Sequence, residues 1–157
     1  MSESPELLKL ASSLDFLYRT QKYLIFDTNA FYYSQGDNLL NMLADVNDIA
    51  VLDVVFLKNQ LLYEGLFLEY IKKREGKIGI IPQVVSELEY QRRLFGDKLR
   101  FFEDIRKRRE RGKHRENVSE HSERNTKVLD RIVTAQCEIL RQVAHQPKRD
   151  MNGEVYQ

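Results

Sequence analysis

Two short apolar runs, each followed by an acidic residue, constrain the fold of this chain more than any other feature. The first run, Leu24–Phe26, ends at Asp27, and the second, Lys77–Ile81, precedes Pro82 and Glu87. Runs of this length predict buried strands. A charged carboxylate at the tip of a buried strand needs water or a partner, so we expect Asp27 at the open edge of a sheet. In α/β sheets that edge is where ligands bind.

Helices are predicted between and around the two strands. Apolar residues at helical spacing and helix start and stop signals predict helices over 5–21, 39–43, 82–94, 98–109 and 126–143. In the stretch 53–74, the residues Val54–Phe56 favour a strand by propensity, but the run Leu57–Ile71 is too long for a strand, so most of this stretch is predicted to be a helix. A break is expected at Phe95–Asp97, and a mobile polar loop over 110–125. Strands over 22–27 and 77–81 that alternate with helices predict an α/β fold, in which a small parallel sheet is flanked by helices.

Length and composition describe an ordinary globular chain. Its 157 residues fit one domain, with 42% hydrophobic and 31% charged residues and a formal net charge of +1. No apolar run is long enough to span a membrane, and the acidic N-terminus lacks the basic start of a secretory signal. We therefore expect no membrane association and an intracellular location, in the nucleus or the cytoplasm. The single cysteine, Cys137, excludes an internal disulfide.

The order of three motifs resembles that of the PIN-domain nucleases. Asp-Thr-Asn follows the first strand at Asp27, the segment Pro82–Leu88 carries Glu87 after the second strand, and a later helix carries Asp130 ahead of Ala135. The charged insertion between the second and third acids is similar to that of eukaryotic-type PIN domains. The resemblance covers residues 22 to 143, and it implies a three-layer, Rossmann-like α/β fold over 22–144 that cleaves RNA.

The resemblance also implies the site residues. Asp27, Glu87 and Asp130 would be the catalytic carboxylates that hold Mg²⁺ or Mn²⁺, while Thr28 and Asn29 would orient a ligand or water behind them. The chemistry fits these residue types, because a hard divalent ion prefers carboxylate oxygens and can activate water for phosphodiester hydrolysis. Three converging acids would repel one another without a cation, which is why such clusters mark metal sites.

The chain departs from the family pattern after the third acid. The family continues into a strand that ends in a fourth acid, whereas this chain continues into a tail over 145–157. Asp150 and Glu154 lie in that tail without a matching context, so neither is assigned the role. An extra helix over 1–21 and incomplete C-terminal strands are therefore expected. The exposed sheet edge would favour a homodimer or a protein partner that completes the sheet.

A basic segment over 106–125 follows the second acid. Its stretch 106–115 holds seven Lys or Arg residues against one acid, a density that can bind phosphates through counterion release, although such a charge run is more often a solvated helix end. Single-stranded RNA is the expected partner. The candidate nucleic-acid-binding residues are Arg92, Arg93, Arg106, Lys107, Arg108, Arg109, Arg111, Lys113 and Arg115.

Each of the three acids also has a purely structural alternative. Asp27 could cap the turn that follows it, and Glu87 or Asp130 could only favour a helix dipole. A degenerate PIN domain would keep the fold and bind RNA or protein without cutting. In a third alternative, a helical interaction module, the first helix and the apolar segment 53–71 would pack on a partner protein.

Overall fold

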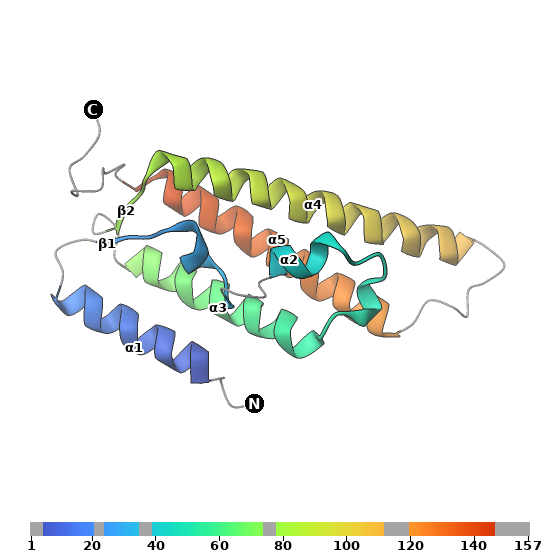
Figure 1. Ribbon diagram of the computed structural model, residues 1–157, viewed down its shortest axis with the longest axis horizontal. Helices are drawn as coiled ribbons and strands as arrows, with labels where there is room; N and C mark the ends of the chain where they lie inside the picture. Colours follow the sequence, from blue (N-terminus) through green and yellow to red (C-terminus); the bar gives the residue numbers. More distant parts are fainter. Residues whose placement is uncertain (1–4, 21–23, 35–38, 74–77, 112–119, 147–157) are drawn as a thin grey trace.

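The computed structural model describes residues 5–20, 24–34, 39–73, 78–111 and 120–146, in which five α-helices accompany one two-stranded sheet (Figure 1). The helices are α1 (Pro5–Thr20), α2 (Leu39–Ala44), α3 (Val54–Lys73), α4 (Pro82–Arg111) and α5 (Glu120–Ala144). The strands are β1 (Leu24–Ile25) and β2 (Ile78–Gly79), and two 3-10 turns are η1 (Thr28–Phe31) and η2 (Ile49–Val51).

The molecule is mostly helical, and the predicted three-layer α/β fold is wrong. Each strand holds only two residues, and the two pair in parallel, with Leu24 opposite Ile78 and Ile25 opposite Gly79. The parallel pairing was predicted correctly, whereas the size of the sheet was not. The apolar residues after position 52 lie in α3 rather than in a strand, because the segment is long enough to form a helix buried along one side.

The longest helix corrects two further predictions. A break was expected at Phe95–Asp97, yet α4 runs through it without interruption. The Phe95 side chain is 1% exposed, and its burial offsets the cost of about 1 kcal/mol that glycine carries at position 96 inside a helix. The predicted loop over 110–125 is also wrong in part, because α4 continues to Arg111 and α5 begins at Glu120.

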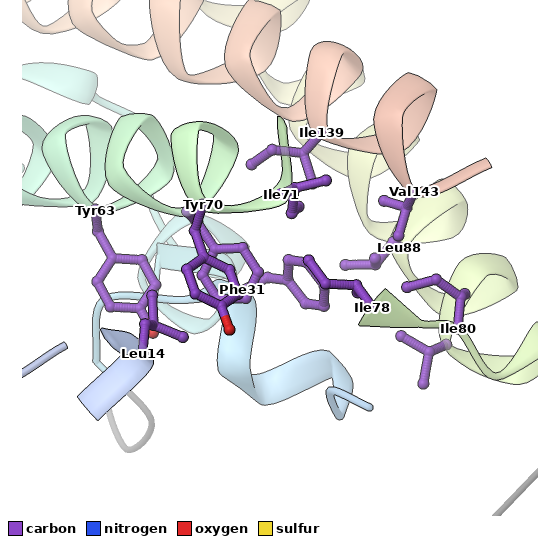
Figure 2. Packing of buried hydrophobic residues seen from close by; sticks show 12 residues of the cluster. Leu14, Phe31, Tyr63, Tyr70, Ile71, Ile78, Ile80, Leu88, Ile139 and Val143 are labelled. Atoms are coloured by element: carbon purple, nitrogen blue, oxygen red, sulfur yellow. The ribbon is translucent and has the colours of Figure 1, made fainter. Parts of the chain in front are cut away.

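The core consists of two clusters along one three-helix layer. Helix α5 packs against both α3 and α4, while α1 lies against α3 (Figure 1). The cluster next to the sheet joins Phe31 to α3, the β2 segment and the ends of α4 and α5 nearest to it (Figure 2). The other cluster joins α2 and η2 to the middle of α4 and α5, with Phe95 and Leu129 at its centre. Both clusters contain residues of α4 and α5, so they fix the position of these two helices along each other.

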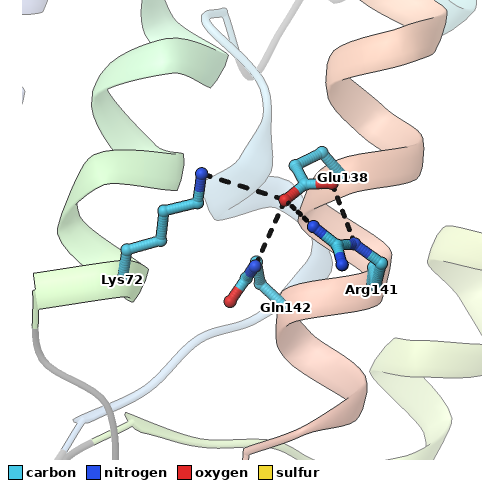
Figure 3. A network of polar contacts seen from close by, with 4 residues as sticks. All are labelled: Lys72, Glu138, Arg141 and Gln142. Atoms are coloured by element: carbon cyan, nitrogen blue, oxygen red, sulfur yellow. Dashed lines mark hydrogen bonds and ion pairs between the residues drawn. The ribbon is translucent and has the colours of Figure 1, made fainter.

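Polar contacts also join α3 to α5. At their surface the carboxylate of Glu138 accepts hydrogen bonds from Arg141, with Nε at 2.9 Å, and from Gln142 at 3.2 Å, and it lies 3.8 Å from Lys72 Nζ (Figure 3). The hydrogen bonds from Arg141 and Gln142 lower the pKa of Glu138 to about 2. Deeper in the molecule, the amide of Asn125 donates to the carbonyls of Ile49 and Leu52 at 2.9 and 3.0 Å, which ties α5 to the η2 turn.

Candidate functional site

Asp27 lies two residues after the end of β1, close to the strand end as the sequence predicts, and is exposed. It occupies the N-cap position of η1, with φ −77° and ψ 159°, but its side chain makes no capping hydrogen bond. The turn is closed by the backbone, since Ala30 N donates to Asp27 O at 3.0 Å. A carboxylate that only capped the turn would accept from these amides. A capping role for Asp27 is therefore not supported.

Glu87 is exposed on α4, beyond the first turn of that helix, which contains no acid. The helix dipole acts within the first turn, so it does not account for an acid at this position. Thr28 Oγ1 donates a hydrogen bond to Glu87 Oε2, and Thr28 is itself 4% exposed. The parallel β1–β2 pair and this hydrogen bond thus place Glu87 beside Thr28, the residue that follows Asp27, and we call Asp27, Thr28 and Glu87 the acidic edge.

The turn that carries Asp27 is held from two sides. From α3, Tyr63 Oη donates to Ala30 O at 2.6 Å, and Gln60 Oε1 accepts from Tyr33 N at 2.9 Å. From α4, Gln91 Oε1 accepts a hydrogen bond from Tyr32 Oη. These contacts fix the backbone on which Asp27 stands before any ligand arrives, which is the preorganisation that a binding site needs. Asn29 is exposed on the same turn.

Asp130 lies apart from Asp27 and Glu87. It is exposed in the middle of α5 rather than near a helix start, and its neighbours Leu129 and Ile132 belong to the cluster around Phe95. Ile139, in contrast, shares the sheet-side cluster with Leu88, the residue next to Glu87. Asp130 precedes Ile139 by about 13 Å along α5, at 1.5 Å per residue. The structure therefore brings together Asp27, Thr28 and Glu87 but leaves Asp130 away from them.

The predicted nucleic-acid-binding residues fall into two groups on α4. Arg93 is exposed and Arg92 half-buried one to two turns after Glu87, whereas Lys107 and Arg108 are exposed about 30 Å along the helix from it. Arg106 is half-buried, and Arg109 and Arg111 belong to the last turn. Lys113 and Arg115 lie outside the described residues. Only the first group is close to the acidic edge.

Asp27 and Glu87 are the residues of the acidic edge that could hold a hard divalent cation with many water ligands. Within the described ranges no group of three or more His, Cys, Asp or Glu residues could hold a metal. Two carboxylates are nevertheless a usual number for Mg²⁺, which keeps several waters and completes its shell with substrate phosphates. Asp27 makes no capping hydrogen bond, and Thr28 contacts only Oε2 of Glu87, so both carboxylates can offer oxygens to such an ion.

A second polar site, which the sequence interpretation missed, lies between α3, α4 and α5. Glu64 is 1% exposed there, and its Oε1 accepts from Gln60 at 3.0 Å and from Gln136 at 3.1 Å. Burial raises the pKa of Glu64 to about 8, against the lowering effect of these two hydrogen bonds. Burial, with a smaller effect of Glu64, also raises the pKa of Tyr32 well above its ordinary range. One signal was available: Gln60 and Glu64 stand one turn apart within an apolar helix.

No helix among the described residues is long and apolar enough to cross a bilayer, in agreement with the sequence. Comparison of the chain with protein families, curated proteins and solved structures found no significant match. The resemblance to PIN-domain nucleases therefore stays a prediction from the three motifs.

Proposed function

We propose that the chain binds one divalent cation, Mg²⁺ or Mn²⁺, through Asp27 and Glu87 and hydrolyses phosphodiester bonds of single-stranded RNA. One observation carries the proposal: the Thr28–Glu87 hydrogen bond, beside the parallel strands, places Glu87 next to the residue that follows Asp27, although the two acids are 60 residues apart in the sequence. The motif order that resembles PIN-domain nucleases supports the choice of RNA.

Each residue of the edge has a role in this proposal. Asp27 and Glu87 would hold the cation, which supplies Lewis acidity and lowers the pKa of a bound water. Thr28 restricts the Glu87 side chain to one orientation by its hydrogen bond. Arg93, exposed on the same helix, supplies a positive charge for the phosphates that flank the cleaved bond. The Tyr32–Gln91 hydrogen bond keeps the turn and α4 in register.

Cleavage of a long single-stranded RNA in the presence of Mn²⁺ or Mg²⁺ tests the proposal. The wild-type chain is expected to cut, whereas Asp27→Asn and Glu87→Gln should each lose at least about a hundredfold in rate, since each removes a charged ligand at constant shape. Glu89→Gln is the matched control, because Glu89 is an exposed acid two residues further along α4. Equal cutting by all four proteins would refute the proposal.

A second candidate is a binding module that holds RNA and the cation without cutting, and the position of Asp130 favours it. The resemblance implies three converging acids, whereas Asp130 stands about 13 Å along α5 from the level of Leu88. Asp130→Asn separates the two candidates further. Loss of cutting in this variant would mean that Asp130 joins the other acids when RNA binds. Retention of RNA binding with no cutting by the wild type would establish the binding module.

The helical interaction module is less favoured. Its proposed contact surface included the apolar segment 53–71, but α3 already packs against α5 and α1 within this chain.

A further inference from the structure

The buried Glu64 lies at a small cleft that has no part in the proposed function. The cleft is lined by Tyr32, Glu64, Leu88, Arg92 and Gln136, and its volume of about 20 Å³ leaves room for a single water molecule. Nothing larger fits, so the cleft is not a site for an organic ligand. The cleft is distinguished by the polar side chains that line it.

Two residues that line this cleft each have an oxygen atom that lacks a hydrogen-bond donor. Glu64 Oε2 and Gln136 Oε1 are both buried and have no partner among the residues that the structure describes, although the Gln136 amide already donates to the other Glu64 oxygen at 3.1 Å. Both orphaned atoms are acceptors as long as Glu64 is ionised. A buried acceptor that lacks a partner destabilises the fold, and a buried unpaired charge destabilises it more.

Protonation of Glu64 would give both orphaned oxygen atoms a hydrogen-bond partner. The protonated Oε2 becomes a hydrogen-bond donor, and Gln136, whose amide already donates to Glu64 Oε1, has an orphaned acceptor in its own Oε1 on the facing helix. We propose that Glu64 is a protonated lock between α3 and α5, and that opening of this helix pair releases the proton, so that rising pH favours the open state.

The surroundings of Glu64 permit this behaviour. On its own helix the nearest polar group is the neutral amide of Gln60, and α5 contributes the neutral amide of Gln136. The segment after η1 contributes the hydroxyl of Tyr32, which remains uncharged. From α4, Arg92 is the single charged side chain that lines the cleft. Its guanidinium lies 3.8 Å from Cys137 Sγ, and it is not among the groups that lower the pKa of Glu64.

The sign of the pH dependence follows from the two states of the carboxyl. In the closed state its pKa is about 8, whereas in the open state it returns toward its ordinary value of 4.5. The closed state is therefore favoured most below pH 4.5 and becomes less favoured as the pH rises. Above pH 8 the preference changes no further. Between these limits the ratio of open to closed molecules should rise about tenfold per pH unit.

Amide hydrogen exchange of the full chain tests the lock. Protection of the α3 and α5 amides is measured from about pH 5 to pH 9 in wild type and in Glu64→Gln, which keeps the shape and removes the titration. Comparison at equal pH cancels the intrinsic exchange rate. The protection of wild type relative to this variant should fall about tenfold per pH unit up to pH 8 and then level off. Glu69→Gln, on the same helix and not buried, should follow wild type.

Two results would overturn the lock. One is a ratio of protection factors that does not depend on pH. The other comes from carbon-detected NMR titration of the wild-type Glu64 carboxyl, which needs no variant to fold: a midpoint near 4.5 instead of about 8 would show that the buried group is ionised at neutral pH.

Discussion

At the scale of single residues, the function proposed for the acidic edge depends on which polar side chains are hydrogen-bonded to one another and which could bind a cation. Thr28 is buried and donates to Glu87, whereas Asp27, the residue before it, makes no capping hydrogen bond although it stands at an N-cap position. Asp27 therefore stands free of capping contacts on a turn that Tyr63 and Gln60 fix, and the proposed cation site would use this carboxylate.

Thr28→Val tests the bridge between the two acids. The substitution keeps the shape but removes the donor to Glu87, so we expect a loss of about 0.5–1.5 kcal/mol in the free energy of unfolding in urea. Mn²⁺ binding measured by calorimetry should weaken as well, because Glu87 is no longer held in place. Thr134→Val is the matched control, since its hydroxyl donates to the Asp130 carbonyl of its own helix, at 3.0 Å. An unchanged Mn²⁺ affinity in Thr28→Val would contradict this role.

At the scale of elements, sequence reasoning succeeded where one signal dominated. The helix before β1 was predicted correctly because a Ser-Pro start precedes a strong apolar repeat. Helix α3 was found from the length of its apolar run, and the middle of α5 from apolar periodicity. It failed at the Gly96 region of α4, where turn propensity was overruled by the burial of Phe95 and Leu99. It also failed at the start of α5, whose first turns bury Asn125 and Thr126 rather than apolar residues.

Gly96→Ala tests the continuity of α4 directly. A Cβ built at position 96 meets no atom within 4 Å, so alanine is accommodated without strain. We expect the free energy of unfolding to rise by about 1 kcal/mol, because alanine is the better helix former. Gly65→Ala in α3 meets no atom within 4 Å either and should give a similar gain. A loss of stability in Gly96→Ala alone would indicate that the helix breaks at Phe95–Asp97.

At the scale of the molecule, the parallel pairing of the two strands could be predicted from the sequence, whereas the amount of helix around them could not. Short apolar runs do not reveal how many residues of each will pair, so the sheet was expected to be larger than the two residues per strand observed. The positions of Asp27 after β1 and of Glu87 on α4 could be predicted because they depend on local order: strand, acid and helix start. Their role as a pair of metal ligands stays a prediction. The place of Asp130 could not be predicted, since it depends on how far α4 and α5 slide along each other.

Paramagnetic broadening by Mn²⁺ in NMR spectra measures directly whether a divalent cation binds at Asp27 and Glu87. At low Mn²⁺ we expect the amides of Thr28, Asn29 and the turn of α4 around Glu87 to broaden first, while those around Asp130 stay sharp. Glu87→Gln should abolish this pattern. Broadening that centres on Asp130, or that is uniform along the chain, would contradict the claim.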